Sequence, residues 1–148
     1  MFDTAGFLSG LIGAVIGGIA TFGVALSAKM AERKSQRSAA VAKVDRAISV
    51  LLVEGANRTA ASPNTNAFFS AIREADSAIV SLRLALGRRE VCVAEWADHE
   101  VHEIKTGIAG SAAAAKQAID RARSATRQLA EWAAGRISPS WFAAELDR

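Results

Sequence analysis

The chain begins with a long stretch that lacks charged side chains. Residues 4–28 hold only apolar and small uncharged residues, and Asp3 is the only charged residue before them. As a helix, these 25 residues would extend about 37 Å at ~1.5 Å per residue, whereas the apolar core of a bilayer is ~30 Å thick. The pattern therefore predicts one transmembrane helix, with residues 1–28 forming the N-terminal tail and the membrane-spanning segment.

A cleaved signal peptide is the main alternative interpretation of this stretch. Ala25-Leu26-Ser27 has the small-x-small spacing of a cleavage site. The amino end, however, lacks the positively charged region that such a peptide needs, and the uncharged run is longer than its usual apolar core. We therefore expect the segment to remain as an anchor, and a mature chain that starts near Ala28 would contradict this expectation.

A basic cluster follows the uncharged run directly. It consists of Lys29, Arg33, Lys34 and Arg37, and no basic residue precedes the run. Because cytoplasmic flanks carry an excess of Lys and Arg, we expect a single pass through the cell (inner) membrane, with the N-terminus outside and residues 29–148 in the cytoplasm. Residues 38–148 would form the cytoplasmic helical domain. Residues 29–46 carry six basic and two acidic side chains, so the basic excess lies beside the membrane. We expect the juxtamembrane segment 29–37 to contact anionic lipid headgroups.

Small residues gather on one side of the predicted membrane helix. At ~100° per residue, an arc of roughly 100° contains Gly6, Gly10, Gly13, Ala14, Gly17 and Thr21. Helices in lipid pair through close backbone approach, which small residues permit. We therefore expect this face to pack against a second copy of the chain or another membrane protein. The alternative is that glycine is simply common in membrane helices.

Helical periodicity continues beyond the basic cluster, and no alternating strand pattern interrupts it. The spacing predicts a first helix over 38–54 that ends at Gly55. It predicts a second helix that starts at Asn64 or Thr65 and ends near Gly87. No breaker separates the first of these helices from the membrane segment, so whether the two are continuous stays open.

A third helix is predicted over 88–134. Residues of two apolar rows recur at seven-residue spacing: Val101, Ile108, Ala115, Ala122 and Leu129 in one row, and Ala97, Ile104, Ser111, Ala118 and Ala125 in the other. Gly107 and Gly110 are potential breaks, but the phase of the rows survives across them. The pattern therefore favours one long, kinked, heptad-like helix. We expect it to face the core of a three-helix bundle, with an extended coiled coil as the alternative.

A short helix completes the predicted fold. Gly135 ends the long helix, and Ser138-Pro139 is a restart signal with Ser as the cap and Pro at the first helical position. We expect this short helix to fold back on the bundle through a small apolar face, which is formed by Trp141, Phe142 and Leu146. The predicted fold is all-α, with one transmembrane helix followed by a small cytoplasmic helical bundle of three main helices and a short C-terminal helix.

The densest polar cluster lies between Glu95 and Glu103 and contains both histidines, His99 and His102. These four residues are the candidate metal ligands. A zincin motif needs its histidines four residues apart, and a di-iron bundle needs Glu-x-x-His on two helices; the sequence contains neither pattern. Because the cluster lies opposite the apolar rows, we expect it to be solvated, and we expect no metal site and no cofactor.

Other sequence features favour a non-catalytic protein. There is no P-loop, dinucleotide-binding turn or Gly-x-Ser-x-Gly elbow, and we expect Cys92 to be a small, neutral thiol. Basic and acidic residues balance over 47–148, which argues against nucleic-acid binding, and no small-molecule substrate is evident. We therefore expect a membrane-anchored interaction, scaffold or regulatory protein. The alternatives are a small membrane-active oligomer, such as a holin-like pore or lysis protein, and an enzyme supported only by the His cluster.

Overall fold

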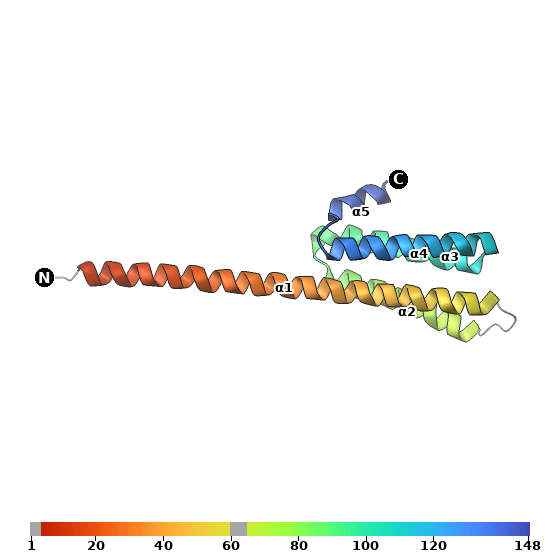
Figure 1. The fold of residues 1–148 in the computed structure, drawn as a ribbon, viewed down its shortest axis with the longest axis horizontal. Helices are drawn as coiled ribbons and strands as arrows, with labels where there is room; N and C mark the ends of the chain where they lie inside the picture. The colour runs from red at the N-terminus through yellow and green to blue at the C-terminus, as the bar shows by residue number, and fades with distance from the viewer. Residues whose placement is uncertain (1–3, 60–64) are drawn as a thin grey trace. The chain divides into compact units, whose positions relative to one another are not determined.

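The computed structural model describes residues 4–59 and 65–148, with side chains described over 28–57 and 66–148. Within the described residues, the regular structure consists of five α-helices and one 3-10 helix, without strands (Figure 1). This confirms the predicted all-α class. The chain divides into two compact units, residues 1–35 and residues 36–148.

The first helix, α1 (Thr4–Thr59), begins in the first unit and ends in the second. The predicted end of this helix at Gly55 is wrong, because α1 continues beyond it. Gly55 is buried, and a Cβ atom added there would overlap Cγ2 of Ile108. The glycine therefore serves close approach between α1 and a later helix rather than helix termination.

The second unit continues with α2 (Thr65–Ala85), η1 (Arg88–Glu90), α3 (Val91–Ala109), α4 (Ala112–Ala133) and α5 (Pro139–Leu146). The first residue of α2 is Thr65, one of the two predicted starting positions. This helix ends before Gly87, as predicted, and Gly87 precedes the 3-10 turn η1. After α4, Gly135 adopts a positive φ of 81°, in agreement with the predicted helix end.

The predicted long helix over 88–134 is wrong, because the structure contains two helices there. At the end of α3, the backbone N–H of Gly110 donates to the carbonyl oxygen of Gly107 at 3.1 Å. Ser111 then caps α4, since its hydroxyl accepts a hydrogen bond from the backbone N–H of Ala114 at 3.3 Å. The two helices run antiparallel and side by side (Figure 1). The apolar rows continue across the turn because both helices direct the same stripe to the core.

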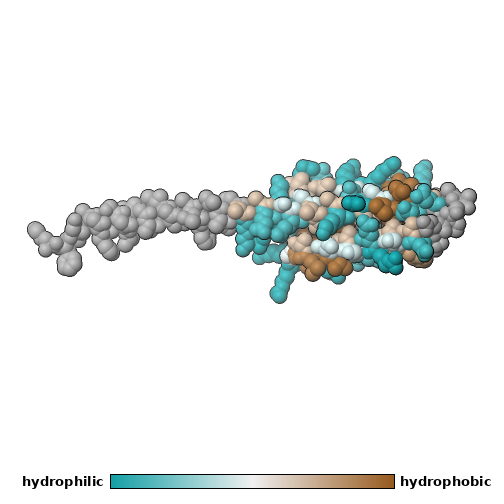
Figure 2. Space-filling view, turned by 90° about the horizontal axis from the view of Figure 1, so that it is seen from below, coloured by the Kyte–Doolittle hydropathy of each residue, from teal (hydrophilic) through white to brown (hydrophobic). Residues whose placement is uncertain are grey.

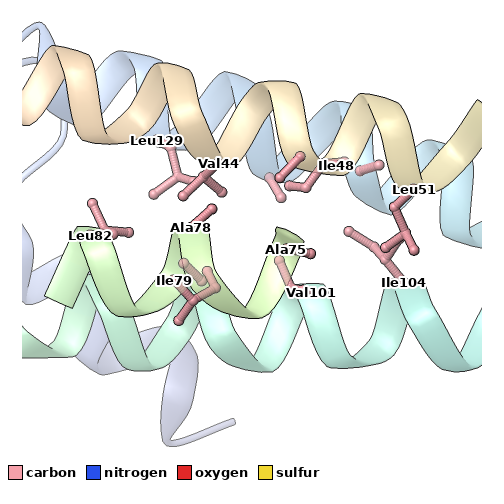
Figure 3. Packing of buried hydrophobic residues seen from close by; sticks show 14 of the residues in the cluster. Val44, Ile48, Leu51, Ala75, Ala78, Ile79, Leu82, Val101, Ile104 and Leu129 are labelled. Carbon is pink, nitrogen blue, oxygen red and sulfur yellow. The ribbon is translucent and has the colours of Figure 1, made fainter. Parts of the chain in front are cut away.

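Four helical segments surround the core of the second unit in place of the three that were predicted. Figure 3 shows Val44 and Ile48 of α1 facing Ala78 and Ala75 of α2. Ile104 of α3 and Leu129 of α4 belong to the same core. Over residues 28–57 and 66–148, no polar or charged side chain is buried, and ten of the 25 buried hydrophobic residues are alanine. Small side chains allow neighbouring helices to approach closely.

The C-terminal helix α5 packs against α3, as predicted. Ser138 and Pro139 start it, but the hydroxyl of Ser138 lies 2.7 Å from that of Ser140 and caps no backbone N–H. Phe142 is completely buried, whereas Leu146 remains 38% exposed. The predicted apolar face of α5 is therefore centred on Phe142.

Candidate functional site

The predicted membrane helix lies outside the residues whose side chains the structure describes. Its predicted packing face lies there as well, with Gly6, Gly10, Gly13, Ala14, Gly17 and Thr21. Over residues 28–57 and 66–148, no helix contains a stretch long and apolar enough to cross a bilayer. The membrane-spanning segment thus stays a prediction from the sequence.

The first three residues of the basic cluster are exposed on α1. Lys29, Arg33 and Lys34 all belong to the first unit, and all three side chains are open to solvent. Lys29 and Arg33 lie four residues apart and so share one side of the helix. Their charges are positioned directly after the uncharged segment and are available to an anionic surface.

Arg37, the fourth basic residue, belongs to the second unit and has protein partners there. Its guanidinium forms an ion pair with Glu90 of η1, and its Cζ atom lies 5.5 Å from the ring centre of Trp132 on α4. The side chain of Glu90 is only 13% exposed. A planar guanidinium suits both contacts, because it pairs with a carboxylate and stacks on an aromatic face. Arg37 therefore connects α1 to η1 and α4, a role that the sequence did not indicate.

Aromatic rings from three helices meet beside this connection. The ring of Phe142 on α5 lies 4.9 Å from the ring centre of Trp96, 4.9 Å from that of Trp141 and 6.5 Å from that of Trp132. All three pairs are edge-to-face, the arrangement that aromatic quadrupoles favour. Cys92 lies in the same region, where its thiol donates to the carbonyl oxygen of Pro139 at 3.2 Å. The cluster joins α3, α4 and α5 into one end of the bundle.

The polar cluster on α3 faces solvent, as predicted. Glu95, His99 and His102 are exposed, and Glu103 accepts a hydrogen bond from Arg121 at 2.7 Å. Over the described residues, no three His, Cys, Asp or Glu side chains come together in a group able to hold a metal ion. The candidate ligands therefore lie on one face of α3, and among the described residues no neighbouring helix adds a further metal ligand to them.

Arg121 of α4 links two carboxylates of α3. Its Nε atom lies 3.3 Å from Glu100, and its Nη1 atom lies 2.7 Å from Glu103. Burial raises the pKa of Glu100 above 4.5, and the nearby carboxylates of Glu103 and Glu145 act in the same direction, while Arg121 and His99 oppose the shift. This arrangement fastens the α3–α4 hairpin on its polar side.

Apolar side chains gather on the outer face of α2. Phe69, Val80 and Leu84 are 54%, 57% and 82% exposed. At ~100° per residue they fall within an arc of about 60°, which also includes Arg73. Figure 2 shows such apolar surface as separate patches among hydrophilic side chains. Contiguous apolar patches mark interaction surfaces, and here the three side chains form a row along one helix rather than one continuous patch. The sequence signal was present, since these residues lie off the buried stripe of the same helix.

The features that can support a function are thus surface features: exposed basic residues after an uncharged segment, a half-buried arginine, and an apolar face on α2. Comparison of the chain with known protein families, with curated proteins and with solved structures found no match.

Proposed function

We propose that this chain is a single-pass membrane-anchored helical interaction protein, with a non-catalytic scaffold or regulatory role. The observation that carries the proposal is the uncharged run 4–28 followed at once by Lys29, Arg33 and Lys34. An uncharged helix of this length matches the thickness of a bilayer, and the basic flank matches a cytoplasmic border. The N-terminus then lies outside, and the helical bundle lies on the cytoplasmic side.

The surface of the bundle supports a role in recognition. Its described buried residues are all apolar, whereas its charged groups lie on the outside. The apolar face of α2, with Phe69, Val80 and Leu84, offers a partner protein large side chains to cover. Arg73 within this face would pair with an acidic residue of that partner.

Self-association through the membrane helix is the second part of the proposal. Gly10 and Gly17 lie on the small-residue face, where side chains do not obstruct close backbone approach. Two anchored copies that pair in the membrane would present two bundles together. A partner that contacts both bundles would then bind with higher avidity.

Reporter fusions test the anchor and its direction. A fluorescent protein fused after Arg148 is expected to fluoresce in membranes that resist carbonate extraction, and a periplasmic phosphatase at the same position is expected to stay inactive. Changing Lys29, Arg33 and Lys34 to Glu is the matched variant, because it removes the charge asymmetry and leaves the uncharged run intact. Release of the chain by carbonate, or an active phosphatase on the unchanged chain, would contradict the proposal.

Dye release separates the anchor from a membrane-active oligomer. Vesicles that contain the full chain and an entrapped dye are expected to retain the dye, because a single apolar helix offers no polar face to line a pore. Loss of the dye in proportion to protein concentration would favour the holin-like alternative.

A further inference from the structure

A groove opens beside the first turns of α4. Its volume is about 350 Å³, and its walls come from Leu52 and Gly55 of α1, Ile108 of α3, and Ala112, Ala115 and Ile119 of α4. All of these residues belong to the second unit. The volume is at the lower end of the range of ~300–1,000 Å³ that is typical of small-ligand sites.

Small residues keep this groove open. Gly55 brings the backbone of α1 directly against Ile108, and the methyl groups of Ala112 and Ala115 do not fill the space beside it. The side chain of Ile119 is 39% exposed at the border of the groove. Each Å² of apolar wall that stays in contact with water costs ~25 cal/mol of free energy, and a bound apolar group removes this cost.

One positively charged side chain lines the groove. Among the described residues that line it, Lys116 is the only one with a charged side chain. The first turn of α4, which borders the groove, holds no acidic residue, so the positive end of its helix dipole is uncompensated there. Asp120, one turn further along α4, already pairs with Arg123 at 3.7 Å. An anionic group beside Lys116 would therefore meet attraction from the side chain and the helix end together.

We propose that this groove binds a fatty carboxylate, with the hydrocarbon chain along the walls and the carboxylate at Lys116. A peptide would bring many backbone N–H and C=O groups against walls that are mostly apolar, with Ser111 as the one uncharged polar side chain among the described lining residues. Most of these groups would then lack hydrogen-bond partners. A hydrocarbon chain brings no such groups. The single charged side chain among the described lining residues, Lys116, matches the single charge of a fatty acid.

Photolabelling of the full chain tests the site. The protein is placed in phosphatidylcholine nanodiscs, labelled with a diazirine-bearing fatty acid, and digested so that mass spectrometry locates the label. We expect label on residues 108–119. Ala112→Phe fills the groove and is expected to remove this label, whereas Ala113→Phe, one residue along the same exposed helix turn and outside the groove, is expected to retain it.

A competition experiment tests the headgroup. Dodecanoate is expected to displace the label at about tenfold lower concentration than dodecanol, because a charge-assisted contact adds affinity. Lys116→Gln should abolish this difference and Lys116→Arg should preserve it. Neither change alters the apolar walls, so they test the site even if Ala112→Phe disturbs the fold.

Three results would overturn the proposal. One is equal labelling of residues 108–119 in Ala112→Phe and Ala113→Phe. Another is label confined to residues 4–28, which would reflect the bilayer alone. The third is a competition result that assigns the groove to a different class of occupant. Either equal competition by dodecanol and dodecanoate or stronger competition by an apolar peptide would be such a result.

Discussion

Arg37 differs from the other basic residues of its cluster in its surroundings. In the sequence it is one of four similar charges, whereas in the structure it contacts Glu90 and lies over the ring of Trp132. This distinction depends on where η1 and α4 fold, and both follow far along the chain. Residue type and local spacing therefore predicted the charge of Arg37 but not its partners.

Arg37→Ala is expected to lower the free energy of unfolding by about 1–3 kcal/mol, because it removes the contact with Trp132 and leaves the carboxylate of Glu90 without its partner. Arg33→Ala is the matched control: Arg33 is exposed, and its loss should change stability by less than ~0.5 kcal/mol. Denaturant unfolding followed by tryptophan fluorescence gives both values. Equal effects of the two substitutions would show that the Arg37 contacts do not stabilise the bundle.

Glu100 gives a prediction for pH. Burial raises its pKa above 4.5, so the folded state retains this proton at pH values at which the unfolded state has lost it. The free energy of unfolding should therefore decrease as the pH rises above 4.5, through the contribution of this group. Glu100→Gln should reduce that slope in unfolding curves measured from acidic to neutral pH. The exposed Glu95 provides the control, and a slope that Glu95→Gln reduces as much as Glu100→Gln would contradict the assignment.

Among the helices, periodicity predicted buried faces better than helix ends. Ile104 and Ile108 on α3 and Ala118 on α4 are buried, as the seven-residue rows predicted. The rows did not reveal the turn at Gly110, because the apolar phase continues through it. Ser111, which the pattern placed in an apolar row, is instead an exposed N-cap. A polar capping residue directly after glycine was the signal for the break.

Gly55→Ala is expected to destabilise the packing of α1 against α3. The added methyl group would overlap Cγ2 of Ile108, and overpacking of this kind costs typically about 1–3 kcal/mol, against a gain of up to ~1 kcal/mol in helix propensity. Gly87→Ala is the control, since a Cβ atom there meets nothing within 4 Å. Thermal unfolding by circular dichroism measures both substitutions.

A double variant identifies the contact itself. Ile108→Ala removes the atoms that the new methyl group would meet, so Gly55→Ala should cost less in the Ile108→Ala background than in the unchanged chain. Costs that simply add would mean that the strain at Gly55 arises elsewhere.

At the scale of the whole molecule, the sequence alone showed the uncharged and basic character of the first unit and predicted the helical fold of the second. The uncharged run and the basic cluster are local patterns, so they can be recognised in the sequence without knowledge of the fold. The apolar face of α2 and the groove at Ala112 and Ala115 depend on which residues the neighbouring helices cover. The groove emerges only when the bundle is assembled, which is why sequence reasoning missed it. The apolar face of α2 could have been found, because its residues lie on the side of the helix opposite the buried positions.

Association of anchored copies is the prediction for the whole molecule. Leucine at both Gly10 and Gly17 should weaken association several-fold in a bacterial membrane two-hybrid assay, because bulky side chains separate the helix backbones. The control replaces Ile12 and Ile19, on the opposite side of the helix, with leucine. If the signal is unchanged in the glycine variant, the small-residue face is not the interface.

The position of Phe142 has a consequence for synthesis. Chains emerge from the ribosome N-terminus first, and this ring belongs to the last helix of the bundle. Until α5 emerges, Trp96 and Trp132 lack the aromatic side chain that covers them. A chain that stops before Phe142 therefore keeps two tryptophans open to chaperones and proteases. Closure of the aromatic cluster therefore requires that α5 has emerged, so copies truncated before Phe142 expose an aromatic surface that copies containing α5 cover.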